Sequence, residues 1–306
     1  MSINTVGVVG AGIMGNGIAQ AFAVSGVDVV LTDIGQAQVD KGLATISGSL
    51  DRLVKKEKMT AEAKAAALAH IKTATSLDAH AGVDLVIEAA TENLALKLDL
   101  FKQIDKIIKP DTILATNTSS ISVTKLAAAT GRADKVVGMH FFNPVPMMAL
   151  VELIRGLQTS DATYAVVEEL AKKVGKTPVQ VRNSPGFVVN RLLCPMINEA
   201  IFALGEKLAT AQEIDDAMKL GCNHPIGPLA LADLIGLEVR DIAGAVMGSV
   251  KSVQNFGADD MLEIAPAAGG PTWYLPFTRD AVPDIRLGDG WLRALRPVEV
   301  GEREPD

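Results

Sequence analysis

The chain has 306 residues, 48% apolar and 21% charged, a balance that excludes intrinsic disorder and gives length enough for two domains. Its net charge of −7 excludes the broadly basic surface that nucleic-acid binding needs. Two cysteines, four histidines and the lack of an apolar run long enough to span a bilayer argue against a metal centre, a disulfide framework and a membrane protein. We therefore expect a globular protein of a reducing, cytoplasmic compartment.

A glycine-rich turn follows the first apolar stretch. Residues 5–9 are typical of a buried strand, and residues 13–24 continue at helical period. Between them lie Gly10, Ala11, Gly12, Ile13, Met14 and Gly15. The first glycine of such a segment makes the turn, the second admits a pyrophosphate, and the third lets the helix pack on the strand. A second strand, 28–32, ends in Asp33, where an acid binds ribose hydroxyls and repels a 2′-phosphate. This order favours an NAD site over a glycine turn without a ligand.

The segment after Asp33 interrupts the alternation of strands and helices. Residues 36–57 predict a long helix, and an alanine-rich helix follows as far as His70. This inserted helical hairpin carries four cations, Arg52, Lys55, Lys56 and Lys58. They form either a solvated charged face or an arm that holds an anionic group of a substrate.

The alternation then resumes. Strands are expected at 71–75, 83–88, 111–116, 136–140, 150–155 and 177–181, and helices at 93–107, 123–129 and 162–174. We therefore predict a doubly wound α/β sheet of about eight strands, mostly parallel, with the last pair antiparallel. Strand 111–116 ends in Asn117, Thr118, Ser119 and Ser120. These side chains meet a ligand at the carboxyl edge of the sheet, cap the following helix, or divide the two roles among them.

One histidine and one glutamate lie in neighbouring apolar strands. His140 ends the strand 136–140, Pro144 and Pro146 force a loop, and Glu152 lies in the middle of the strand 150–155. An acid in so apolar a strand is costly to bury unless it is paired. A His–Glu dyad would leave one imidazole nitrogen free to act as a base. The alternative is a lone core histidine, with Glu152 on an exposed edge strand.

The composition changes at the polar segment that contains Pro185 and Gly186. Helices are expected at 187–204, 211–220 and 229 to about 250. We predict a Rossmann-type domain at 1–184 and an all-helical domain at 185–306, whose tail after about 250 is atypical. Asn190 lies in the first turn of the first of these helices, either facing the cleft between the domains or on the helix surface.

Together these segments resemble the 3-hydroxyacyl-CoA dehydrogenase family over roughly residues 3 to 236. The segments GAGIMG, NTSS, GMHFFNPVP, LVELIRG, SPGFVVNR and HPIGPLALADLIGL stand in the order typical of that family. The resemblance implies NAD as cofactor and a short-chain 3-hydroxyacyl-CoA as substrate. It also implies a homodimer formed through the helical C-terminal domain.

The resemblance also implies roles for individual residues. His140 looks like the general base and Glu152 like the carboxylate that orients it. Ser119 and Asn190 resemble the polar contacts near the substrate oxygen and the nicotinamide. Positions that match cofactor contacts are Glu92, Lys97, Ser119 and Asn143, and positions that match coenzyme A contacts are Ser49, Lys56 and Ser119. No metal ligand is implied.

Two other functions remain as alternatives. The chain could be a catalytically weak or inactive NAD-binding relative, as in crystallins, or a β-hydroxyacid dehydrogenase that uses a lysine base, although the helix around Asn190 contains no lysine. The tail departs from the family, because six of the 14 prolines lie in the last 41 residues. It is either a diverged cap or the product of a late change of reading frame. Prolines at this density predict irregular structure after about Phe256, with dimerisation and activity weakened.

Overall fold

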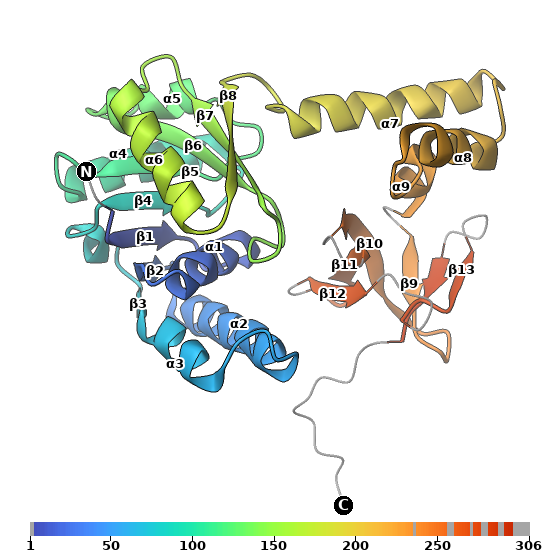
Figure 1. The fold of residues 1–306 in the computed structure, drawn as a ribbon, viewed down its shortest axis with the longest axis horizontal. Coiled ribbons are helices and arrows are strands. Elements are labelled where there is room, and N and C mark those ends of the chain that lie inside the picture. Colours follow the sequence, from blue (N-terminus) through green and yellow to red (C-terminus); the bar gives the residue numbers. More distant parts are fainter. Residues whose placement is uncertain are drawn as a thin grey trace, which may run out of the picture. The chain divides into compact units, whose positions relative to one another are not determined.

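The computed structural model describes residues 3–234, 237–255, 260–269, 272–276, 281–286 and 291–295. Its contacts divide the chain into two units, Met1–Arg191 and Leu192–Asp306, and each is described by itself (Figure 1). The boundary predicted at 184/185 lies a few residues before this division. Within the described residues, no helix combines the length and apolarity needed to cross a bilayer.

The first unit is built on an eight-stranded sheet in the order β3-β2-β1-β4-β5-β6-β7-β8. Its strands are β1 (Thr5–Val9), β2 (Asp28–Thr32), β3 (Ile71–Ala74), β4 (Leu85–Glu88), β5 (Ile113–Thr116), β6 (Val136–Phe141), β7 (Leu150–Arg155) and β8 (Thr177–Arg182). The strands are rich in valine, isoleucine and leucine because both faces of a parallel sheet are covered. The predicted Rossmann-type sheet is confirmed. The antiparallel pair was expected to be the last one, β7 with β8. It is instead β6 with β7, and β7 pairs parallel with β8.

Helices cover both faces of this sheet (Figure 1). They are α1 (Ile13–Val24), α2 (Gln36–Lys55), α3 (Ala61–Ala69), α4 (Leu94–Ile107), α5 (Val123–Ala127) and α6 (Asp161–Lys173), with 3₁₀ turns η1 (Leu77–His80) and η2 (Ala133–Lys135). One buried core joins the sheet to α1, α2, α3 and α6, and another joins it to α4 and α5. The expected helical hairpin is present as α2 and α3.

The predicted helix α7 (Val189–Gly205) begins at the end of the first unit and continues into the second, which also contains the predicted helices α8 (Ala211–Cys222) and α9 (Pro228–Leu234). Thr210 and Glu213 form a capping box that starts α8. The buried carboxylate of Asp215 accepts the amide N–H groups of Leu229 and Ala230, each at 2.8 Å, and so caps α9. The C-terminal domain is therefore helical as far as Leu234.

From Glu238 onward the all-helical prediction is wrong, because the chain forms a six-stranded sheet in the order β12-β11-β10-β9-β14-β13. Its strands are β9 (Glu238–Arg240), β10 (Val246–Asn255), β11 (Asp260–Pro266), β12 (Trp273–Pro276), β13 (Asp284–Arg286) and β14 (Trp291–Arg293). Alternate side chains such as Leu262 and Ile264 fill its core, which is a strand period rather than a helical one.

The prediction of irregular structure after about Phe256 is also wrong for the described part of the tail. Pro266 and Pro276 end strands, where a missing amide donor costs little. Residues 256–259, 270–271, 277–280, 287–290 and 296–306, on which the same prediction falls, lie outside the described residues.

Candidate active site

The loop between β1 and α1 has the geometry of a pyrophosphate cradle. Gly10 has φ +101°, and a Cβ there would lie 2.6 Å from the carbonyl oxygen of Ala89. A Cβ on Gly15 would overlap the carbonyl oxygen of Gly10. At Gly12, the residue before α1, a Cβ would meet no atom within 4 Å. The loop is thus closed against the protein and open toward a ligand at the amino end of α1, where a phosphate is favoured.

Asp33 is fixed beside this loop. Its Oδ2 accepts the amide N–H of Ala11 at 2.7 Å, and its Oδ1 accepts that of Ile34 at 2.7 Å. The carbonyl oxygen of Thr32, the last residue of β2, accepts the N–H of Gly10 at 2.8 Å. Asp33 and the glycine loop are therefore hydrogen-bonded to each other, which places the carboxylate where the ribose next to the pyrophosphate would lie.

His140 and Glu152 are brought together as a buried pair. They lie opposite each other in the antiparallel pairing of β6 with β7, and His140 Nδ1 lies 2.8 Å from Glu152 Oε2. His140 is 7% exposed and Glu152 only 1%. The hydrogen bond excludes a lone histidine, and the burial of Glu152 between β6 and β8 excludes an exposed edge position.

The second oxygen of Glu152 is also occupied. Oε1 accepts the amide N–H groups of Val188 and Val189 at 3.0 Å each, where α7 begins. Gly186 and Phe187, with φ of +74° and +50°, turn the chain so that these amides face the carboxylate. Burial raises the pKa of Glu152, but the bonds from His140, Val189 and Val188 lower it more, so its pKa lies below the usual value.

An ionised Glu152 fixes the tautomer of its partner. A carboxylate only accepts hydrogen bonds, so the neutral imidazole of His140 carries its proton on Nδ1 and leaves a lone pair on Nε2. The ring is held by two aromatic neighbours, with centroids 4.6 Å away at Phe142 and 5.5 Å away at Phe187. The pair can therefore serve as an oriented general base.

The loop after β5 is organised by Glu92. The amide of Ser119 donates to Glu92 Oε1 at 2.8 Å, its hydroxyl donates to the same oxygen at 3.2 Å, and the hydroxyl of Thr118 donates to Oε2 at 2.7 Å. Helix α5 is capped instead by Ser122, whose Oγ accepts from Lys125 N–H. The capping alternative for Asn117 to Ser120 is therefore wrong.

Behind this loop lies an ion pair that the sequence analysis missed. The Nζ of Lys97 lies 2.7 Å from both carboxylate oxygens of Glu88 and 3.9 Å from Glu92. Glu88 also accepts the hydroxyl of Thr116 at 2.9 Å. The side chain of Lys97 is only 2% exposed, so its charge acts on Glu92 from a buried position. Glu88 ends an apolar strand, the same signal that identified Glu152.

The remaining predicted residues lie on three different elements. Ser49 lies on α2 and Lys56 at its carboxyl end, two helical turns apart on one face, while Asn143 follows β6 and Asn190 is the second residue of α7. Lys56 is exposed, and the other three are half-buried. Asn190 belongs to the first unit, as does the His–Glu pair.

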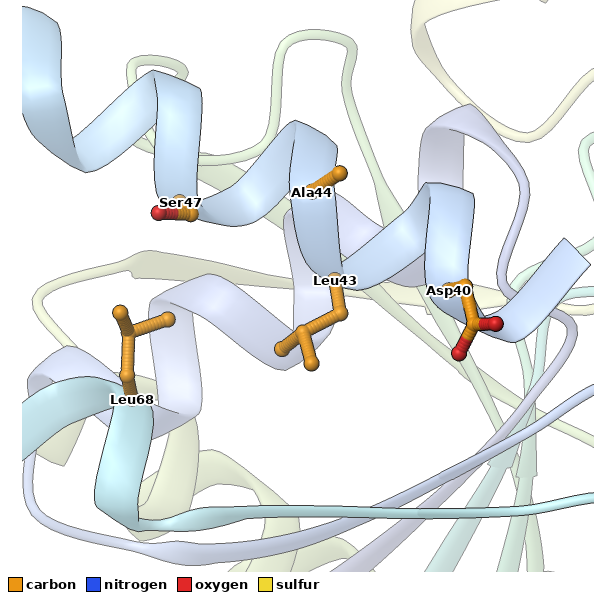
Figure 2. A pocket seen from close by; sticks show the side chains of 5 residues that line it. All are labelled: Asp40, Leu43, Ala44, Ser47 and Leu68. Carbon is orange, nitrogen blue, oxygen red and sulfur yellow. The ribbon is translucent and has the colours of Figure 1, made fainter. Parts of the chain in front are cut away.

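A shallow pocket of about 410 Å³ lies on the helical hairpin. Figure 2 shows its lining, which consists of Asp40, Leu43, Ala44 and Ser47 on α2 and Leu68 on α3. These α2 positions recur at intervals of three and four residues and share one face, whereas Ser49 and Lys56 project from the opposite face. The pocket is thus separate from the predicted coenzyme A contacts. Among the described residues, no group of histidine, cysteine or acidic side chains is arranged to hold a metal ion.

A dinucleotide cradle and an oriented base on one mostly parallel sheet define a nicotinamide-dependent oxidoreductase of the Rossmann class. The family model described as the 3-hydroxyacyl-CoA dehydrogenase NAD binding domain matches residues 5–184, and that of the C-terminal domain matches 186–269. The chain belongs to the 3-hydroxyacyl-CoA dehydrogenase family. The C-terminal match includes the strands β9, β10 and β11 of this chain.

Individual relatives agree with this assignment. The chain is 53% identical over 232 residues to the 3-hydroxybutyryl-CoA dehydrogenase of Clostridioides difficile, covering 76% of this chain and 83% of the relative. To the enzyme of that name from Bradyrhizobium diazoefficiens it is 51% identical over 236 residues, covering 77% and 80%. The crystal structure of (S)-3-hydroxybutyryl-CoA dehydrogenase from Ralstonia eutropha matches with a TM-score of 0.75 and 68% identity, over 77% of this chain and 83% of that one.

Proposed function

We propose that this protein catalyses the reversible, NAD-dependent oxidation of (S)-3-hydroxyacyl-CoA, with 3-hydroxybutyryl-CoA as a preferred substrate, to the 3-ketoacyl-CoA. The single observation that carries the proposal is the buried His140–Glu152 pair on the sheet that holds the glycine cradle. The family and the relatives described above support the substrate class.

The proposed mechanism assigns a proton to each residue. His140 Nε2 takes the proton of the 3-hydroxyl group, and Glu152 stabilises the imidazolium that forms. NAD⁺ held in the glycine cradle would supply the acceptor for the hydride of C3, so that oxidation would give the ketone, NADH and one proton. In the reverse direction the imidazolium returns its proton to the ketone oxygen. Ser119 and Asn190 are proposed to contact the substrate oxygen and the nicotinamide, and Asn143 and Glu92, backed by Lys97, the cofactor.

The cofactor is held by residues at the carboxyl edge of the sheet. The cradle comprises Gly10, Ala11, Gly12, Ile13, Met14 and Gly15, and Asp33 receives the ribose hydroxyls. The coenzyme A part is proposed to bind Ser49, Lys56 and Ser119. Lys56 and its three basic neighbours on the hairpin are all exposed, and none of them forms an ion pair within the part of the chain that the structure describes. Such cations suit a phosphate-bearing substrate.

We also propose domains at 1–184 and 185–306 and a homodimer formed through the second. Large apolar side chains of its first two helices and of the loop between them are exposed, namely Leu192, Ile201, Phe202, Leu204, Leu208 and Leu220. An apolar surface of this kind is typical of a protein interface. The two cysteines, Cys194 and Cys222, are free and exposed, which fits a reducing, cytoplasmic compartment.

The experiment that tests the function is an NADH-formation assay with 3-hydroxyacyl-CoA thioesters of increasing chain length. Turnover of 3-hydroxybutyryl-CoA with NAD⁺ is expected. An inactive protein that still binds NADH would favour the crystallin-like alternative, and turnover of free 3-hydroxy acids would favour the lysine-base alternative.

A further inference from the structure

Strand β6 loses its pairing with β5 just before His140 but keeps its pairing with β7. On one side, the ladder with β5 ends at the pair Thr116 and Gly138. On the other side, the ladder with β7 continues through His140 to Phe141. The last three residues of β6 therefore have no paired residue in β5. A strand end of this kind is free to fray unless another group accepts its outward N–H.

The side chain of Asn117 supplies that group. Its Oδ1 accepts the amide N–H of Phe141 at 2.9 Å, in a contact buried from solvent. The backbone N–H of Asn117 itself donates to the carbonyl oxygen of Glu88 at 2.8 Å, next to the end of β4. Asn117 thus continues the sheet beyond β5, with its backbone held on β4 and its side chain on β6.

This contact fixes the orientation of the histidine. The N–H of Phe141 belongs to the peptide group that follows the Cα of His140, and a peptide group is planar. Holding that N–H therefore sets the backbone angle beside the imidazole, while Glu152 holds the ring at Nδ1. Asn117 also lies two residues before Ser119. Its side chain therefore connects β6, which carries His140, to the loop after β5, which carries Ser119.

We propose that Asn117 is a positioning residue, which sets His140 relative to Ser119 for proton transfer. This inference rests on the proposed dehydrogenase function. Its role differs from that of the glycine cradle and the basic hairpin, which lie on other elements. Loss of the Asn117 acceptor should therefore lower kcat much more than it changes the KM for NAD⁺.

Four variants separate positioning from general stability. Asn117→Ala removes the acceptor, and Asn117→Leu removes it while keeping a side chain branched at the same carbon, which keeps the test available if the alanine variant does not fold. Asn117→Asp retains an acceptor oxygen. The matched control is Asn183→Ala, because Asn183 Oδ1 also accepts a backbone N–H, that of Val123 at 2.9 Å, at the start of α5.

Two readouts are measured for each variant: steady-state kcat and KM, and the NMR signal of the His140 Nδ1 proton. In Asn117→Ala and Asn117→Leu we expect kcat to fall about tenfold or more, with the KM for NAD⁺ within about twofold, because small misplacements of a reacting group are costly. The Nδ1 proton signal should broaden. Asn117→Asp should recover most of the loss, and Asn183→Ala should keep kcat within about twofold.

The inference is overturned if both acceptor-free variants keep wild-type kcat, if Asn117→Asp is as impaired as Asn117→Leu, or if Asn183→Ala loses as much. A wild-type protein without activity would instead overturn the proposed function. In that case the Nδ1 proton signal still tests the positioning role, because it is observed without turnover.

Discussion

His140 and Glu152 stand directly opposite each other across the only antiparallel pairing in the described part of the first sheet. The carboxylate joins two parts of the molecule, because one oxygen holds the imidazole and the other caps the start of α7 at Val188 and Val189. Glu152 therefore ties the orientation of the base to the first turn of the helix that carries Asn190. The predictions below begin from this arrangement.

Replacing Glu152 with glutamine should impair catalysis far more than folding. The amide oxygen can still accept from Val188 and Val189, which turns the NH₂ group toward His140 Nδ1. A donor there moves the imidazole proton to Nε2, the atom that must accept the proton of the substrate. We expect kcat to fall on the order of 10²–10⁴-fold. His140→Ala should show a similar loss while still binding NADH, as measured by fluorescence titration. Near wild-type kcat in either variant would refute the dyad.

Replacing Asp33 with serine should relax the selectivity for NAD over NADP. The carboxylate beside Ala11 repels a 2′-phosphate, and serine removes the charge but keeps a hydrogen-bonding group. The ratio of kcat/KM with NADH and NADPH measures the effect. Asp28→Ser, at the opposite end of β2, is the matched control and should keep the wild-type ratio. Equal use of both cofactors by the wild-type protein would show that Asp33 has another role.

Replacing Lys56 with alanine should raise the KM for acyl-CoA and leave NAD⁺ affinity unchanged. The effect should be larger at low salt, because exposed charges are screened by ions. Lys58→Ala removes another exposed cation from the same hairpin and shows whether the effect is specific to Lys56 or shared with its basic neighbours. If both variants keep the wild-type KM at every salt concentration, these lysines belong to a solvated face.

Protonation of His80 should make the folded protein less stable in mild acid. Its imidazole is fully buried, with Nε2 2.8 Å from Thr32 Oγ1, and burial lowers its pKa from 6.5 to about 4. The unfolded chain therefore binds more protons than the native state between these two values. The stabilisation is complete above about pH 6.5 and is lost as the pH falls toward 4, a change of about 3 kcal/mol. Urea unfolding at pH 7 and pH 4.5 measures it. In His80→Asn this part of the pH dependence should vanish. If the free energy of unfolding of the variant still fell as much as that of the wild type between pH 7 and pH 4.5, His80 would not be its cause.

The second unit should form a dimer through its exposed apolar helices. Phe202 is 56% exposed, and Phe202→Asp would place a charge in the proposed interface. Light scattering should report a dimer for the wild type and a monomer for the variant. Leu295→Asp, which changes an exposed side chain beyond β14, should remain dimeric. A wild-type monomer would indicate that the β-sheet tail does not preserve the interface that the family resemblance implies.

Much of the site could be predicted from local sequence. Three glycines after a buried strand specify the cradle because a Cβ at two of them would strike the backbone, whatever the rest of the fold does. An acid inside an apolar strand indicates a buried partner because an unpaired buried charge is too costly, and this located Glu152. The same reasoning applied to Glu88 would have found its ion pair with Lys97.

Tertiary structure decided what depends on contacts between distant segments. Two contacts of the site are of this kind: the amides of Val188 and Val189 donate to Glu152, and the amide of Phe141 donates to Asn117. They depend on strand pairing and on the turn at Phe187, which no local sequence pattern predicts. The tail shows the same limit. Its prolines correctly predict that long helices are absent from the described part of the tail. The short segments between them become strands only because the six strands from β9 to β14 pair with one another, and the local sequence does not show which segment will pair with which.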